Sequence, residues 1–118
     1  MLREFLKSKI HRATITRANL DYSGSLTIDE EIMEKAGIAE FEKIQVYNVN
    51  NGERLETYAI KGPRGSKAFE LNGAAARKGM VGDKIIITTF CILSEDELKD
   101  YKPKVLIMGD KNEIEEII

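Results

Sequence analysis

Short apolar runs of strand length recur along the chain, and only a few stretches show helical spacing. The runs are rich in Ile, Val, Thr or aromatic residues and are bounded by residues that favour turns, which is typical of strands. They predict six strands, over residues 9–18, 43–50, 54–60, 67–71, 84–93 and 104–108. Between the second and the third, Asn51-Gly52 predicts a two-residue type I′ hairpin turn, because both central residues of that turn need positive φ.

Three short helices are also predicted. Thr27 and Glu30 have the spacing of a capping box, in which both side chains satisfy free amides at a helix start, and Gly37 is a suitable end for this helix. Ser94 and Glu97 repeat the capping-box pattern before a second short helix, and a run of three alanines predicts a third. The last ten residues are acidic and weakly patterned, which fits either a frayed end or a contact with a partner.

Many strands and few helices within 118 residues predict a mainly β fold. A closed barrel is favoured over an open sheet, because an open sheet would leave long unpaired edges. The chain shows no internal repeat and no linker-like stretch, so residues 1–118 are expected to form one domain.

The composition, 42% hydrophobic and 32% charged, is typical of a globular protein and excludes a disordered chain. The longest apolar stretch, residues 85–93, is far shorter than the roughly 20 residues that span a bilayer, so no membrane association is expected. The first ten residues carry charges throughout and lack the apolar centre of a signal peptide. A single cysteine fits a reducing compartment, which predicts a cytoplasmic protein.

The charge distribution leaves one alternative open. Net charge is −2, so no overall field favours nucleic acid, yet the first 17 residues hold five bases and one acid. This segment fits either a solvated strand face or the anion-binding surface of a non-catalytic β-barrel module. We expect the former, and therefore no nucleic-acid partner.

The familiar catalytic residue sets are missing. One histidine and one cysteine cannot supply a zinc site with the common spacings, so no metal is expected. Cys91 lies between Phe90 and Ile92, a setting typical of a buried and inert thiol. If the protein is an enzyme, its reactive group has to come from elsewhere.

The turn Tyr22-Ser-Gly-Ser25 offers such a source, although Gly and Ser are also ordinary residues of a surface turn. A serine hydroxyl can attack the carbonyl of the preceding residue and convert the amide to an ester, and Gly24 has no Cβ that would block the approach. A distorted turn would add about 1–3 kcal/mol of strain that favours this step. Elimination and hydrolysis would then leave a pyruvoyl group at Ser25.

The strand over residues 54–60 carries a second set of candidates. Alternation places Arg54 and Tyr58 on one face and Thr57 on the other. The planar fork of Arg54 suits a carboxylate, and Tyr58, with an ordinary pKa of about 10, can act as an acid at neutral pH. The alternative is a strand with one exposed arginine and a half-buried tyrosine.

Two further positions have weaker signals. Lys9 and His11 are two residues apart in the first predicted strand and share a face, although a lone histidine is more often structural than catalytic. Asn72 precedes a run of small residues whose backbone amides are open to an anion, or it is simply the cap of a helix.

Together these segments resemble the aspartate 1-decarboxylase family, the pyruvoyl-dependent enzymes that make β-alanine for pantothenate and coenzyme A synthesis. The resemblance covers most of the chain and depends on the order and spacing of several short motifs. The motifs are Lys9-Ile-His11, Tyr22-Ser-Gly24-Ser25, Asn51-Gly52 followed by Arg54 and Thr57-Tyr58-Ala59-Ile60, Arg64-Gly-Ser66, Asn72-Gly-Ala-Ala75 and Val81-Gly82-Asp83.

The resemblance implies a double-psi β-barrel and a cytoplasmic homotetramer of four α and four β chains. Each subunit would cut itself between Gly24 and Ser25, giving a β chain of residues 1–24 and an α chain of residues 25–118. A need for a maturation factor stays open, as does an unprocessed relative that serves only in assembly. One departure is Tyr47, where relatives more often carry tryptophan, and it bears on substrate packing.

The resemblance also implies roles for individual residues. Ser25 would become the pyruvoyl group that forms a Schiff base with L-aspartate, and Tyr58 would donate a proton to the carbon that loses carbon dioxide. His11 and Tyr22 would lie near the processing site at Gly24. The substrate would be bound by Thr57, Gly73, Ala74, Ala75, Arg54, Lys9 and Asn72.

Overall fold

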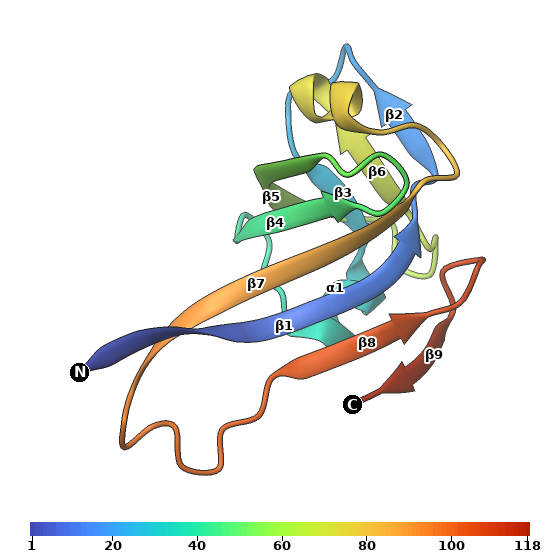
Figure 1. The fold of residues 1–118 in the computed structure, drawn as a ribbon. Helices are drawn as coiled ribbons and strands as arrows, with labels where there is room; N and C mark the ends of the chain where they lie inside the picture. Colours follow the sequence, from blue (N-terminus) through green and yellow to red (C-terminus); the bar gives the residue numbers. More distant parts are fainter.

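The structure is a computed structural model that describes all of residues 1–118, and most of its regular elements are strands (Figure 1). Three strands are long: β1 (Leu2–Thr14), β5 (Arg54–Gly62) and β7 (Lys84–Ser94). The shorter ones are β2 (Arg17–Asn19), β3 (Leu26–Asp29), β4 (Lys43–Asn48), β6 (Phe69–Asn72), β8 (Lys104–Met108) and β9 (Ile114–Ile117). The helices are α1 (Glu30–Ala36) and the 3₁₀ helix η1 (Gly73–Lys78). Neither has the length and apolar character that a helix needs to cross a bilayer.

All nine strands belong to one sheet, in the order β2-β6-β3-β5-β4-β7-β1-β8-β9. β1 and β7 pair antiparallel and form a long ribbon across the molecule (Figure 1). The chain passes from β1 to β2 across only two residues, although these strands stand far apart in the sheet order. The sheet therefore curls back on itself, and the backbone N–H of Thr16 donates to the carbonyl of Phe69 at 2.9 Å beside this crossing.

The core lies inside this curled sheet. Side chains alternate between buried and more exposed positions along β4 and parts of β1 and β7, whereas all four residues of β3 are buried. The largest core side chains, including Phe69, are fully buried. α1 adds Ile32, Met33 and Ala36 to the same cluster. A mainly β, single-domain fold with few short helices is thus confirmed, and it is consistent with the expected double-psi β-barrel.

Five of the six predicted strands are found within two residues of their predicted ends, β3 and β9 were missed, and the predicted strand over residues 9–18 is divided between β1 and β2. β1 begins at Leu2 rather than near residue 9, because its first half pairs with the far end of β7. β9 pairs antiparallel with β8, so the frayed end, one of the two alternatives for the last ten residues, is wrong. The first error concerns a pairing between segments that are distant in sequence, whereas β9 follows β8 after five residues and was missed because its local pattern is weak.

The predicted helix starts also need correction. Thr27 lies inside β3, and the side chain of Asp29 caps α1 by accepting a hydrogen bond from the backbone of Glu31 at 2.8 Å. The predicted stop is confirmed, because Gly37 has φ +73° and its N–H donates back to the helix. Ser94 and Glu97 do form reciprocal capping-box hydrogen bonds, but only turns follow them.

The Asn51-Gly52 turn is not the two-residue hairpin that was predicted. Five residues separate β4 from β5, and Gly52 has φ +77° whereas Asn51 has no positive φ. The side chain of Asn48 organises the loop instead, since its Oδ1 accepts from the backbones of Asn50 and Asn51 at 2.8 and 3.2 Å. Asn48, three residues before Asn51, therefore supplies the turn chemistry.

Asp29 ties α1 to the loop before β6. Its buried carboxylate accepts hydrogen bonds from the backbone N–H groups of Glu31, Gly65 and Lys67 at 2.8, 3.0 and 2.7 Å. Burial opposes the charge, but these three donors and the nearby charge of Lys67 outweigh it and hold the pKa of Asp29 below its ordinary 3.8. The buried Asp29 side chain thus contributes two of the hydrogen bonds that hold the loop over residues 63–67 in place.

Asp29→Asn is expected to lower the free energy of unfolding by about 2 kcal/mol at neutral pH, because one amide oxygen cannot serve three buried donors. The native pKa lies below the unfolded one, so the carboxylate stabilises the fold above pH 3.8 and this contribution is lost as the pH falls through the native value. Urea unfolding between about pH 5 and pH 2 should therefore show a weaker pH dependence in Asp29→Asn than in wild type. The exposed Asp96→Asn is the matched control, and an equal effect of both variants would contradict the role of Asp29.

Candidate active site

Gly24 and Ser25 lie in the connection that leads into β3, and both have positive φ, +32° and +102°. Ser25 is not a glycine, and its φ lies well away from the left-handed minimum. Such a conformation costs on the order of 1–3 kcal/mol. It is also only 1% exposed. A strained backbone and a buried hydroxyl therefore meet at the peptide bond that the sequence singled out.

Asn72 holds Ser25 through two hydrogen bonds. Its backbone N–H donates to the carbonyl of Ser25 at 3.0 Å, and its side-chain Nδ2 donates to Ser25 Oγ at 3.1 Å. The alternative that Asn72 is a side-chain helix cap is wrong, because this side chain makes no capping hydrogen bond to η1. The side-chain amide of Asn72 donates to Ser25 Oγ instead.

Gly73 presses directly against the connection that contains Gly24. It has φ +64°, and a Cβ added there would lie 2.6 Å from the backbone nitrogen of Gly24 and 2.7 Å from the carbonyl oxygen of Tyr22. No side chain fits at this distance, so glycine is required for both space and conformation. Tyr22 contributes its backbone carbonyl to this contact, whereas its side chain is half exposed.

A cavity of about 240 Å³ opens beside Ser25. Most of its walls come from positions that the sequence analysis selected, namely Gly24, Ser25, Thr57, Asn72, Ala74 and Ala75. Leu55, Glu56 and Lys78 complete it and were missed. Lys78 is the only cation among them, and its Nζ lies 2.7 Å from Glu53. No sequence motif marked Lys78, because the 3₁₀ turn decides which side of η1 faces the cavity.

Tyr58 approaches Gly24 without lining this cavity. Leu26 pairs with Ala59, so Ser25 is level with Tyr58 on the neighbouring strand. The Tyr58 hydroxyl lies 3.9 Å from the place that a Cβ on Gly24 would occupy, and its ring is 40% exposed. A proton donor is therefore available next to the bond between Gly24 and Ser25.

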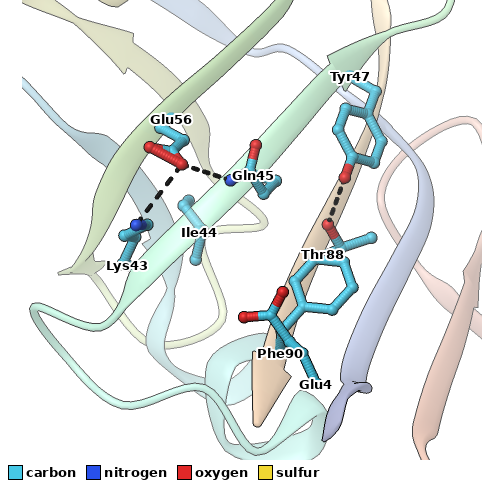
Figure 2. A pocket seen from close by; sticks show the side chains of 8 residues that line it. All are labelled: Glu4, Lys43, Ile44, Gln45, Tyr47, Glu56, Thr88 and Phe90. Carbon is cyan, nitrogen blue, oxygen red and sulfur yellow. Dashed lines mark hydrogen bonds and ion pairs between the residues drawn. The ribbon is translucent and has the colours of Figure 1, made fainter. Parts of the chain in front are cut away.

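Arg54, by contrast, does not reach the cavity. It pairs with Tyr47 across β4 and β5, and its guanidinium carbon lies 4.2 Å from the centre of the Tyr47 ring. Figure 2 shows a groove of about 450 Å³ lined by residues of β4, β5 and β7, in which the Thr88 hydroxyl donates to that of Tyr47 at 3.1 Å. Glu56 lies against this groove, held by Gln45 Nε2 at 2.6 Å.

Lys9 and His11 also lie away from the cavity, on β1. Lys9 pairs with Thr88, so it belongs to the same outer face as the groove of Figure 2. His11 has a buried Nδ1 without a hydrogen-bond partner. Burial, followed by the charges of Lys9 and Arg12, lowers the pKa of His11 below 6.5. One chain thus does not bring Lys9, His11 and Arg54 to Ser25.

Comparison with known proteins gives one consistent result. A family model described as aspartate decarboxylase matches residues 1–115. The chain is 62% identical over 114 residues to an aspartate 1-decarboxylase of Caldicellulosiruptor saccharolyticus, a match that covers 97% of this chain and 89% of the relative. It is 56% identical over 117 residues to the aspartate 1-decarboxylase of Ralstonia nicotianae, covering 99% and 98%. A relative of the same name from Desulfotalea psychrophila is 54% identical over 118 residues, covering 100% and 99%.

The close approach of Gly73 predicts an unusually large cost for a single methyl group. Gly73→Ala should lower the free energy of unfolding by about 3 kcal/mol or more, because it combines a positive φ with a clash against backbone atoms. Gly52→Ala is the matched control, since Gly52 has φ +77° but nothing within 4 Å of an added Cβ. It should cost only about 1–2 kcal/mol. Urea unfolding of both variants measures the difference, and equal costs would contradict the close approach.

Proposed function

The chain belongs to the aspartate decarboxylase family, and on that premise we propose that it makes its own reactive ketone by cutting itself between Gly24 and Ser25. It is a carboxy-lyase that converts L-aspartate to β-alanine and carbon dioxide, the reaction that supplies β-alanine for pantothenate synthesis. Family membership favours this enzyme over the non-catalytic binding module that the basic first segment left open.

The proposed cleavage needs only the chain and one water molecule. Ser25 Oγ attacks the carbonyl carbon of Gly24, and the C–N bond breaks as the nitrogen takes up a proton, which leaves an ester. Loss of the Cα proton of residue 25 then expels the Gly24 carboxylate from Cβ. Water hydrolyses the resulting enamine, ammonia leaves, and a pyruvoyl ketone is left at the start of an α chain of residues 25–118. The β chain of residues 1–24 ends in the Gly24 carboxylate.

Backbone conformation around Ser25 is the observation that supports this proposal. Its φ of +102° and the φ of +32° at Gly24 raise the energy of the intact chain, which the cleaved chain no longer has to bear. Burial keeps bulk water from the ester, and Asn72 holds Oγ in one place. Holding a nucleophile against its target can contribute several of the ~7–11 kcal/mol available from ideal orientation.

The residues around the cavity fit a ketone at position 25. Such a group withdraws the electron pair that a departing carboxylate leaves behind. We assign substrate binding to Thr57 and to the backbone of Gly73, Ala74 and Ala75, with Asn72 beside them. Tyr58 is the proposed proton donor, because its hydroxyl lies next to Gly24 on the neighbouring strand.

The distribution of charge supports the proposed homotetramer. Aspartate carries two carboxylates, but the cavity has one cation, Lys78, which is paired with Glu53. Arg54 lies four residues along β5 from the level of Ser25, about 13 Å at the usual rise of a strand, and β1 with Lys9 is separated from β3 by three strands. We therefore propose that the outer face of a second copy, carrying Arg54 and Lys9, covers the cavity and binds the substrate carboxylates.

Within the cell, we propose a cytoplasmic location, which agrees with a single cysteine and with the pathway that uses β-alanine. His11 and Tyr22 stay candidates for processing. Tyr22 contributes its carbonyl beside Gly73, whereas His11 on β1 reaches a cleavage site only in a neighbouring copy. A maturation factor would act on this same connection between β2 and β3.

Mass spectrometry of the purified protein tests self-cleavage. Wild type should give two fragments, one ending at Gly24 and one beginning with a blocked residue 25, and should release carbon dioxide from L-aspartate. Ser25→Ala should stay one chain and release none, because it has no hydroxyl to attack the carbonyl. Ser23→Ala, which removes the other serine of the same turn, should behave as wild type. An uncut wild-type chain that still decarboxylates aspartate would disprove the proposal.

Co-expression of two inactive chains tests the shared site. Ser25→Ala lacks the ketone but keeps Arg54, and Arg54→Gln keeps the ketone but lacks the guanidinium. If chains mix at random, doubly tagged assemblies should recover about a quarter of wild-type activity, because sites pair a ketone from one chain with Arg54 from another.

The matched pair for this experiment is Ser25→Ala with Tyr58→Phe. Tyr58 lies beside Gly24 of its own chain, so no mixed assembly restores both groups to one site. Recovery in the first pair alone supports a site between copies. No recovery in either pair would show that Arg54 acts within its own chain or not at all.

A further inference from the structure

We propose that the hydroxyl of Thr27 positions the Asn72 amide over Ser25 Oγ and thereby sets the rate of self-cleavage. The inference rests on the proposed cleavage at Gly24–Ser25. Thr27 is a positioning residue in this account, since it acts on Ser25 only through Asn72.

Strand pairing brings the three side chains to one face. Leu26 is opposite Leu71 in the antiparallel pair of β3 and β6, so Ser25 is opposite Asn72. Thr27 is two residues beyond Ser25 and therefore points the same way. All three are buried, with exposed fractions of 1% for Ser25, 2% for Asn72 and 8% for Thr27.

The Asn72 amide is shared between the two hydroxyls. Its Nδ2 donates to Ser25 Oγ at 3.1 Å and to Thr27 Oγ1 at 2.8 Å, so both amide hydrogens are used. The terminal torsion of an asparagine is broad and has only a weak preference of its own. Without Thr27, one buried hydrogen would lose its acceptor, and the amide would turn away from Ser25 to find another.

Thr27 itself has little freedom. Its Cγ2 methyl group packs against Gly62 of β5, where an added Cβ would lie 2.9 Å from that methyl. A β-branched side chain has few allowed rotamers, so fixing the methyl also fixes the hydroxyl. Gly62, Thr27 and Asn72 thus form a chain of contacts that ends at the nucleophile of the cleavage.

The consequence concerns the direction in which Ser25 Oγ points. A hydroxyl free to rotate spends part of its time away from the Gly24 carbonyl, and each lost orientation lowers the chance of attack. The backbone hydrogen bond from Asn72 to Ser25 holds the chain, whereas the amide holds the hydroxyl. Removing the Thr27 hydroxyl should therefore slow cleavage without changing the nucleophile.

The test follows cleavage of chains made by cell-free translation, with the cut fraction measured by intact mass at intervals after synthesis stops. Thr27→Val should be cut roughly tenfold more slowly than wild type, because it keeps the shape but offers no acceptor. Thr27→Ser, which restores the hydroxyl, should be cut within about twofold of the wild-type rate. Thr89→Val is the matched control, since Thr89 is equally buried and its hydroxyl bonds to Ser8 elsewhere in the sheet. It should lose stability but keep the wild-type rate.

A second variant acts on the same contact from the other side. Gly62→Ala should slow cleavage because its methyl group displaces the Cγ2 of Thr27. Gly62→Ala combined with Thr27→Ser should recover, because serine has no Cγ2 to displace. If Gly62→Ala slowed cleavage only by disrupting the fold, adding Thr27→Ser would not restore the rate.

The outcomes separate this inference from the function on which it rests. If wild type is cut but Thr27→Val is cut as fast, the inference fails and the proposed function stands. Equal slowing by Thr27→Val and Thr27→Ser would assign the effect to the methyl contact and overturn the role of the hydroxyl. A wild-type chain that stays whole would overturn the cleavage itself and this inference with it.

Discussion

The contact between Gly73 and the connection before β3 is the constraint on which the site depends. Two backbone segments approach so closely there that no Cβ fits, and the segment containing Gly24 is pressed into a conformation with positive φ. The strain is maintained because both segments run directly into paired strands, β6 on one side and β3 on the other. A turn with ends free to move would relax, and Ser25 would lose its place against the Gly24 carbonyl.

Burial of polar groups then gives this strained turn its chemistry. Ser25, Thr27 and Asn72 are buried side by side, and each accepts or donates within the trio because bulk water is excluded. The same arrangement explains why β3 was not predicted from the sequence. Thr27 was predicted to cap a helix, but its hydroxyl is needed inside β3, and Asp29 caps α1 instead.

The candidate residues of β5 are divided between two surfaces. Thr57 faces the cavity beside Ser25, Arg54 lies against Tyr47 of β4 on the outer face, and Glu56 lines both the cavity and the groove of Figure 2. Within one chain, Arg54 does not reach the cavity, because it lies four residues along β5 from Tyr58, the residue level with Ser25. The proposed assembly of identical copies would bring Arg54 of one copy to the cavity of the next.

Local chemistry in the sequence was enough to locate most strands, the stop at Gly37, the candidate Gly24-Ser25 pair and the small residues that line the cavity. Those features depend on side-chain period, glycine conformation and a neighbouring hydroxyl, all of which act within a few residues. The tertiary structure alone decided that β9 pairs with β8, that Lys78 faces the cavity, that Thr27 supports Asn72, and that Arg54 and Lys9 lie away from Ser25. Apart from the β8–β9 pair, whose second strand has only a weak local pattern, these features depend on which distant segments become neighbours when the sheet closes, and a local pattern contains no information about that closure.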